Sequence, residues 1–109
     1  MAALDPLAIA IPERGDVEPA AHVEIAAAAE AAGFDLLLVP ESWGMDAFTR
    51  LGYLAAHTDT IHLGTGIVNV FSRSPALLAQ SAATLDRFTD GRAVLGLGVS
   101  SPAVVEGWH

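Results

Sequence analysis

Polar side chains that could bind or transform a small molecule are concentrated in four short segments, each of which follows an apolar run. These segments are residues 12–14, 40–44, 64–73 and 98–101. Their carboxylates, hydroxyls and guanidinium groups suit proton transfer and the orientation of a substrate or cofactor. The sequence has no cysteine, which excludes thiolate chemistry and metal ligands built on sulfur, and no metal site is expected.

Two Gly-x-Gly pieces, at residues 64–66 and 96–98, resemble part of a dinucleotide-binding loop. In neither does a third glycine follow at the required offset and open a helix, and both fall inside or at the end of a predicted strand. Small residues at such positions allow the backbone to approach another backbone or a flat ligand closely. A dinucleotide site of the Rossmann type is therefore not expected.

The apolar runs that precede the polar segments are predicted to be strands. They cover residues 7–11, 35–40, 61–66 and 92–98, and they are almost continuously apolar, where a half-exposed strand would alternate. Continuous apolar character is typical of parallel strands that are covered on both faces. We expect four buried parallel strands.

Helical patterns separate these strands. Pro19 suits a first helical position, and the alanine-rich run after it extends to residue 32, before Gly33. Asp46 is the predicted N-cap of a second helix that runs to about residue 57, and Ser74, followed by a proline, is the predicted N-cap of a third. The expected order is βαβαβαβ.

Length decides between two architectures with this order. A (β/α)8 barrel uses about 31 residues per unit, and the second, third and fourth strands begin 26 and 31 residues apart. A doubly wound sheet with the same order would end with an uncovered edge strand and one helix short. The expected fold class is α/β: residues 1–109 form the N-terminal half of a TIM barrel, truncated after strand four.

Composition limits the partners. The net charge of −8 has the wrong sign for a general grip on nucleic acid or an anionic membrane, so neither is expected. The first residues lack the features of a secretory signal, and no apolar stretch approaches the roughly 20 residues of a bilayer span. A cytoplasmic protein that acts on a small molecule is expected, with self-association through exposed barrel edges.

Five ordered blocks carry a resemblance to a known family. They are residues 61–69 (IHLGTGIVN), 73–76 (RSPA), 83–86 (ATLD), 91–92 (GR) and 95–98 (LGLG). With these blocks, the chain from residue 7 onward resembles the bacterial luciferase-like superfamily, and within it the oxidoreductases that use the deazaflavin coenzyme F420. The resemblance implies a (β/α)8 barrel that binds flavin or deazaflavin at the C-terminal mouth.

The resemblance also implies cofactor-binding residues. In such proteins a bulge on strand three carries a non-prolyl cis peptide behind the cofactor ring, and the matching bond is Gly66-Ile67. Asn69 matches a polar position near the ring, and the segment after strand four matches one that lines the cofactor cleft. The implied cofactor-binding residues are Gly66, Ile67, Asn69, Val99, Ser100 and Ser101.

Catalytic and substrate residues follow from the same resemblance. Glu13 aligns with a carboxylate after strand one. Glu41 and Ser42 match an acidic residue and a histidine that serves as the base in alcohol dehydrogenases of the family. Ser42 cannot abstract a proton unaided at neutral pH, which favours a reductase or a monooxygenase over an alcohol dehydrogenase. Trp43 and His109 are candidates for contact with the substrate.

Three functions stay open from the sequence. A reduced deazaflavin would pass hydride from its C5 to a small organic substrate, or FMN would activate oxygen in a luciferase-like monooxygenase. The third is a non-catalytic half-barrel that self-associates, because half a barrel exposes strand edges and an apolar inner face. The remaining histidines, His22, His57 and His62, fall away from the predicted mouth and are expected to be structural.

Overall fold

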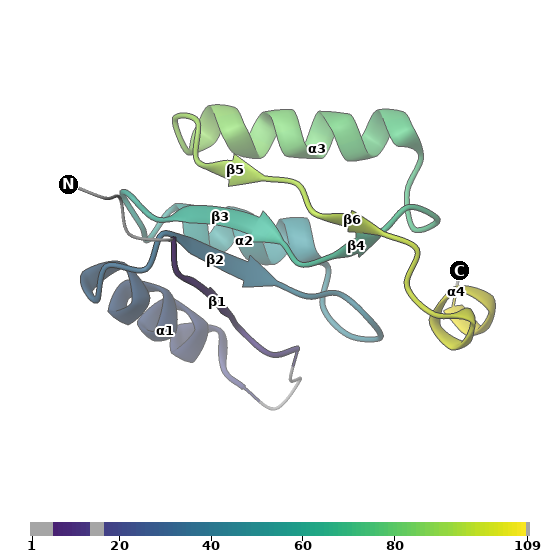
Figure 1. The fold of residues 1–109 in the computed structure, drawn as a ribbon, viewed down its shortest axis with the longest axis horizontal. Coiled ribbons are helices and arrows are strands. Elements are labelled where there is room, and N and C mark those ends of the chain that lie inside the picture. Colours follow the sequence, from purple (N-terminus) through teal and green to yellow (C-terminus); the bar gives the residue numbers. More distant parts are fainter. Residues whose placement is uncertain (1–5, 14–16, 109) are drawn as a thin grey trace.

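The computed structural model describes residues 6–13 and 17–108, in which strands and helices alternate along the chain (Figure 1). The strands are β1 (Ala8–Ala10), β2 (Leu36–Val39), β3 (His62–Thr65), β4 (Val68–Asn69), β5 (Ala93–Val94) and β6 (Leu97–Gly98). The helices are α1 (Pro19–Ala31), α2 (Ala47–Ala55), α3 (Pro75–Phe88) and α4 (Pro102–Trp108).

The main sheet is parallel, and its strands lie in the order β1-β2-β3-β5. A second parallel pair, β4 and β6, continues the third and fourth strands toward their carboxyl ends. The third strand ends at Thr65 and resumes at Val68, beyond the bulge that the resemblance implied at Gly66-Ile67. The fourth strand was expected as one run over residues 92–98, but it is interrupted after Val94. A backbone hydrogen bond of 3.0 Å from the NH of Val68 to the carbonyl of Gly96 joins the two neighbours across the interruption.

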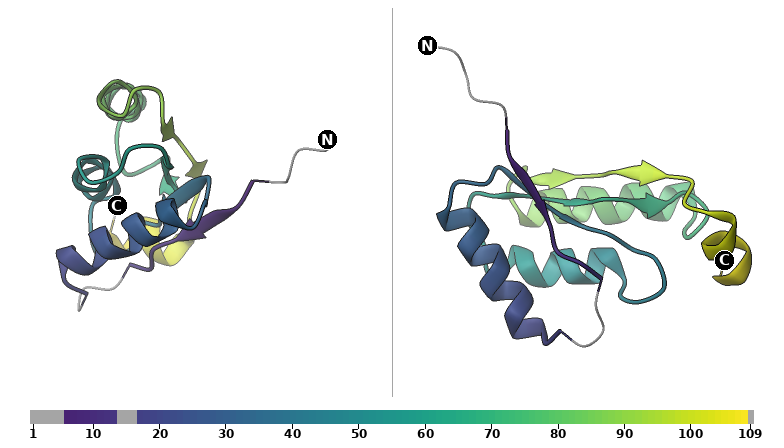
Figure 2. Two further views of the ribbon diagram at one scale, coloured as in Figure 1. Left: turned by 90° about the vertical axis from the view of Figure 1, so that its left-hand side faces the viewer. Right: turned by 60° about the horizontal axis from the view of Figure 1, so that its bottom comes forward.

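The helices α1, α2 and α3 lie on one face of the sheet (Figure 2). A right-handed crossover between parallel neighbours places its helix on a fixed side, and the strand order never reverses, so successive helices stay together. A doubly wound sheet would reverse its strand order and cover both faces. The α/β half-barrel expected from the sequence is therefore confirmed, and the doubly wound alternative is excluded.

The core lies between the sheet and these helices. Leu37 and Leu63 face each other across β2 and β3 and are fully buried against Leu51 and Leu54 of α2. Each fully buried leucine of this kind stabilises the fold by about 1.5–3 kcal/mol. Apolar burial thus fixes which strand face meets the helices.

The opposite face of the sheet carries Leu38, Gly64 and Val94, because side chains alternate between the faces of a strand. A Cβ added to Gly64 would lie 2.9 Å from Cβ of Val94 and 3.2 Å from Cδ2 of Leu38, so these residues share one surface. Val94 remains 38% exposed. This apolar face corresponds to the interior of a barrel.

Two predicted helix starts are confirmed. The carboxylate of Asp46 accepts a hydrogen bond of 2.8 Å from the NH of Thr49, and the hydroxyl of Ser74 accepts one of 3.1 Å from the NH of Leu77. Both caps satisfy NH groups that have no partner within the helix. No helix in the described ranges is long and apolar enough to cross a membrane.

Helix α4 was not predicted. It begins at Pro102, directly after Ser101, whose hydroxyl accepts a hydrogen bond of 3.4 Å from the NH of Val104. The serine-proline pair that starts α3 therefore recurs at α4. The helix lies beyond the carboxyl ends of the strands, where it does not cover the sheet (Figure 1).

Candidate functional site

Four polar segments gather at the carboxyl edge of the sheet, as expected of parallel strands. They lie at or after the ends of β1, β2, β4 and β6, and they include Glu13, Glu41, Asn69 and Ser101. In a barrel this edge is the mouth where catalytic and binding residues lie. His109, a predicted substrate contact, lies outside the described residues.

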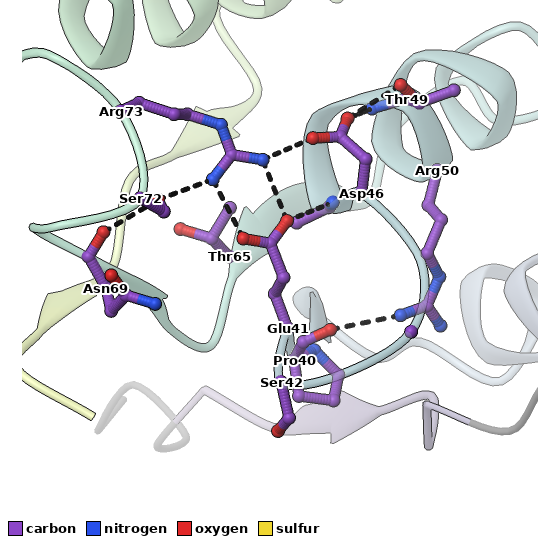
Figure 3. Close-up of polar contacts among 12 residues, drawn as sticks. Pro40, Glu41, Ser42, Asp46, Thr49, Arg50, Thr65, Asn69, Ser72 and Arg73 are labelled. Atoms are coloured by element: carbon purple, nitrogen blue, oxygen red, sulfur yellow. Dashed lines mark hydrogen bonds and ion pairs between the residues drawn. The ribbon is translucent and has the colours of Figure 1, made fainter. Parts of the chain in front are cut away.

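Arg73 joins the segment after β4 to the segment after β2 (Figure 3). Its guanidinium donates two parallel hydrogen bonds of 2.8 Å to the carboxylate oxygens of Glu41 and one to the carboxylate of Asp46. It also donates to the hydroxyl of Ser72 at 2.8 Å and lies 5.0 Å from the ring centroid of Phe48. The side chains of Arg73 and Glu41 are 11% and 6% exposed, so this is a buried bidentate ion pair.

The ion pair changes the proton affinity of its members. Hydrogen bonds to Glu41 are the main cause that raises the pKa of Arg73, against an opposing effect of burial. Burial raises the pKa of Asp46, but hydrogen bonds from Thr49 and Arg73 outweigh it, and the net pKa lies below its ordinary value. Arg73 and Asp46 therefore stay charged through the physiological range.

The Glu13 carboxylate holds the segment after β2 from the other side. One oxygen accepts a hydrogen bond of 2.6 Å from the NH of Ser42, and the other accepts one from the NH of Gly44. A carboxylate that accepts two backbone NH groups fixes a loop with charge-assisted bonds. In this arrangement Glu13 is a positioning residue for the loop that carries Trp43.

Glu41 also has its oxygens occupied. Oε1 accepts from Arg73, and Oε2 accepts from Arg73 and from the NH of Ala47 at 2.7 Å. This geometry differs from that of a free catalytic acid, which needs an oxygen directed at the reacting atom. Glu41 is placed to orient the mouth.

Arg50 forms a second clamp behind the mouth. It donates to the carbonyl of Pro40 at 3.1 Å and to the carbonyls of Ile11 and Pro12 at 3.4 Å, which ties the ends of β1 and β2 together. Burial lowers the pKa of Arg50, and the charge of Glu13 raises it. The sequence pattern gave no signal for this role, because its partners are backbone carbonyls up to 39 residues away.

The Gly66-Ile67 peptide bond, which the resemblance singled out, is cis. Gly98 of β6 and Gly96 just before it allow the backbone of this segment to lie close to Thr65 and Ile67. A Cβ at Gly98 would lie 3.2 Å from Cγ1 of Ile67, and one at Gly96 would collide with the carbonyl of Thr65. The hydroxyl of Thr65 donates to the carbonyl of Gly96 at 2.8 Å and accepts from its NH at 2.9 Å.

Asn69 is buried at the end of β4 (Figure 3). Its side-chain oxygen accepts a hydrogen bond of 3.0 Å from the NH of Phe71, and its carbonyl accepts one of 2.8 Å from the hydroxyl of Ser72. These bonds form the turn that delivers Arg73 to Glu41. Asn69 and the ion pair are therefore parts of one connected network.

The segment after β6 borders a hollow of about 280 Å³. Ser100 has a left-handed backbone conformation with φ of 59°, and Val99 and Phe71 are exposed beside it. The hollow is lined by Phe71, Val99, Ser100, Ser101, Pro102, Val105 and Glu106. Apolar walls and hydroxyl groups thus share one cavity.

Trp43, the expected substrate contact, stacks on Trp108 of α4. The ring centroids are 6.0 Å apart, and the planes differ by 19°. The segments after β2 and after β6 therefore meet across the mouth. Within the described ranges, no group of three or more histidine, aspartate and glutamate side chains could hold a metal ion.

Sequential parallel strands, helices on one face and polar loops at the carboxyl edge define a portion of a (β/α)8-barrel protein. The particular family follows from sequence comparison. The model of the luciferase-like monooxygenase family matches residues 6–109, and the chain belongs to this family.

The relatives of the chain are oxidoreductases. It is 46% identical over 95 residues to a protein of Mycobacterium tuberculosis provisionally named a coenzyme F420-dependent oxidoreductase, covering 87% of this chain and 27% of that protein. It is 37% identical over 79 residues to the 5,10-methylenetetrahydromethanopterin reductase of Methanolobus tindarius, covering 72% of this chain and 24% of the reductase. The chain thus spans about a quarter of the length of these curated relatives.

Solved structures share the fold. The coenzyme F420-dependent tetrahydromethanopterin reductase of Methanopyrus kandleri gives a TM-score of 0.87 at 28% identity, over 96% of this chain and 30% of that one. A type II Baeyer-Villiger monooxygenase of Pseudomonas putida in complex with FMN gives 0.78 at 18% identity, over 88% of this chain and 30% of that one. The second likeness concerns the fold alone.

Proposed function

We propose that this chain belongs to an oxidoreductase that transfers hydride between coenzyme F420 and a small organic substrate. One observation supports the proposal: a sequence relative and a structural relative are both named for coenzyme F420. A relative named for F420 chemistry is 46% identical over 87% of the chain, and an F420-dependent reductase has the same fold over 96% of it. Because the chain spans 30% of that reductase, the substrate and the complete activity are part of the proposal.

The residues at the mouth fit part of a flat, polar-edged ring. The hollow after β6 combines the apolar side chains of Phe71 and Val99 with the hydroxyl-bearing Ser100 and Ser101. Gly98 lets the side chain of Ile67 pack directly against the β6 backbone, where an added Cβ would collide with it. Flavin and deazaflavin rings need such an apolar floor with a few polar contacts at the edge.

In the proposed enzyme, the residues of this chain bind and orient. Gly66, Ile67 and Asn69 would hold the cofactor ring, and the segment after β6 would line its cleft. Reduced F420 supplies the hydride when bound, because the cofactor carries the chemistry of such reactions. The chain supplies geometry and exclusion of water: Glu13 and Glu41 hold the loop that presents Trp43 to the substrate.

An FMN-dependent monooxygenase is the second candidate. The FMN-bound neighbour supports it through the fold alone, at 18% identity. The match to a luciferase-like monooxygenase of Escherichia coli, 48% identical, extends over only 44% of the chain. The longer alignment with an F420-named relative favours F420 over FMN.

Titration of the purified chain with F420 and, separately, with FMN tests the proposal, with cofactor fluorescence as the readout. We expect saturable binding of F420 without comparable binding of FMN. Asn69→Ala should weaken F420 binding, whereas Gln80→Ala, which removes the same group from an exposed position on α3, should not. Preference for FMN would favour the monooxygenase.

A half-barrel that self-associates is the candidate from another class. Among the residues that the structure describes, β1 pairs in the main sheet with β2 alone and β5 with β3 alone, so both edges offer free backbone groups. The apolar face that carries Leu38 and Val94 adds a driving force for association. Light scattering coupled to size-exclusion chromatography tests this candidate, because a monomer at all concentrations would contradict it.

A further inference from the structure

A cavity of about 560 Å³ lies between α1 and α2, in the helical layer of the fold. This volume falls within the range of roughly 300–1,000 Å³ that small-molecule sites occupy. Most of the wall is apolar and comes from Pro19, Met45, Tyr53 and Leu54, together with the polar side chains discussed below. The site is distinct from the hollow after β6 and goes beyond the proposed function.

Arg50 brings a buried positive charge to this cavity. The residue is 6% exposed, and its hydrogen bonds go to main-chain carbonyls of the β1 and β2 ends. In the part of the chain that the structure describes, the ion pairs are those of Arg73, and Arg50 has none. Its Nε is buried without a hydrogen-bond partner. The charge of Glu13 offsets part of the cost of burying this cation, and an anion bound at Nε would offset more of it.

His22 adds a second unpartnered group to the same wall. It is 4% exposed, and its Nε2 has no hydrogen-bond partner. Burial, and then the charge of Arg50, lower the pKa of His22, so the imidazole is neutral at physiological pH and keeps one NH to donate. Buried polar groups in folded proteins are nearly always paired, so these two nitrogen atoms indicate missing hydrogen-bond partners. One acceptor satisfies both when the neutral imidazole carries its proton on Nε2.

The carboxylate that borders the cavity does not fill this role. Asp46 accepts hydrogen bonds from the NH and the hydroxyl of Thr49 and pairs with Arg73. Its charge is therefore already neutralised on the side of the mouth. In the described ranges, no side chain accepts a hydrogen bond from Nε of Arg50 or from Nε2 of His22, and a ligand in the cavity would supply the acceptor.

We propose that the cavity between α1 and α2 binds a small organic acid. Its carboxylate accepts hydrogen bonds from the unpaired NH groups of Arg50 and His22, and its apolar body packs against Tyr53 and Leu54. Because Arg50 also holds the carbonyls at the ends of β1 and β2, the ligand contacts a residue that shapes the mouth.

Calorimetric titration of the chain with benzoate tests the site, with benzyl alcohol as the neutral analogue of the same size. We expect saturable binding of benzoate and at least about tenfold weaker binding of benzyl alcohol, because a charged hydrogen-bond acceptor is replaced by a neutral one. The ring resonances of His22 should shift during the titration, and those of the exposed His62 should not.

Two variants and a matched control complete the test. His22→Leu and Arg50→Lys should each weaken benzoate binding about tenfold, and His62→Leu, the same change at an exposed histidine of β3, should leave it within about twofold. If Arg50→Lys fails to fold by circular dichroism, His22→Leu decides. Absence of saturable binding, equal affinity for benzyl alcohol, or an unchanged affinity of His22→Leu would overturn the proposal. F420 is not used, so these outcomes are independent of the proposed function.

Discussion

Replacement of Arg73 by methionine is the most informative perturbation of the mouth. Methionine keeps much of the apolar stem and removes the guanidinium. The Glu41 side chain, 6% exposed in the unmodified protein, then retains the NH of Ala47 as its one partner among the described residues. Breaking a buried ion pair by removal of one partner costs about 3–5 kcal/mol, and loss of the contact with the Phe48 ring adds about 0.5–1 kcal/mol. Because Glu41 retains one donor, we take the low end and expect a loss of about 3–4 kcal/mol.

Urea unfolding followed by circular dichroism measures this loss. With a slope of about 1–3 kcal/mol per M, the midpoint should fall by roughly 2 M. Arg87→Met removes an arginine from the exposed last turn of α3 and should change the stability by no more than about 0.5 kcal/mol. The double variant Arg73→Met/Glu41→Met should be less damaged than Arg73→Met alone, because it leaves no buried charge without a partner.

Two results would refute this reasoning. A loss below about 1 kcal/mol for Arg73→Met would mean that the pair stabilises the fold no more than an exposed salt bridge does. Additive losses in the double variant would mean that Arg73 and Glu41 are not coupled. In either case the segments after β2 and β4 would be held by other contacts.

Three further predictions concern the loops and the strands. Gly52→Ala should raise the free energy of unfolding by about 0.5–1 kcal/mol, because an added Cβ meets nothing within 4 Å and alanine favours the helix. Gly98→Ala should instead lower it by about 1–3 kcal/mol through crowding of Ile67, and urea melts that rank the two variants in the opposite order would contradict this packing. Glu13→Ala should accelerate hydrogen exchange at the NH groups of Ser42 and Gly44 at least about tenfold, while Glu24→Ala on α1 leaves both rates unchanged. Burial raises the pKa of Glu30, but hydrogen bonds from the NH groups of Ile61, Thr60 and Asp59 together outweigh this effect, so the pKa in the folded state lies below 4.5. Its stabilising contribution is therefore present above pH 4.5 and is lost as the pH falls through the folded value, and Glu30→Gln should be less sensitive to acid in urea melts over that interval.

Local signals in the sequence located most of the fold. Leu36–Val39 is strand because a short apolar run is bounded by turn residues, and α3 begins where a serine and a proline cap it. The break between β3 and β4 coincides with the bulge that the resemblance implied at Gly66-Ile67, whereas the break between β5 and β6 was not predicted, because an apolar run does not reveal where strand pairing is interrupted. Helix α4 was missed although Ser101 and Pro102 repeat the start signal of α3.

The contacts at the mouth were less accessible from the sequence. Arg73 was visible only as part of a motif, and its partner Glu41 lies 32 residues away along the chain. Arg50 binds backbone carbonyls, which every residue possesses, so no residue type marks its partners. Pairings of this kind depend on the relative placement of strand ends, which only the folded chain determines.

Engineers often exchange single loops between barrels, on the assumption that each loop is an independent part. In this chain the segment after β2 takes its support from Glu13, which follows β1, and from Arg73, which follows β4. A graft of residues 40–46 alone would arrive without these supports and would leave Arg73 facing an unmatched surface. Transplantation of this mouth requires the three segments to be moved as a set.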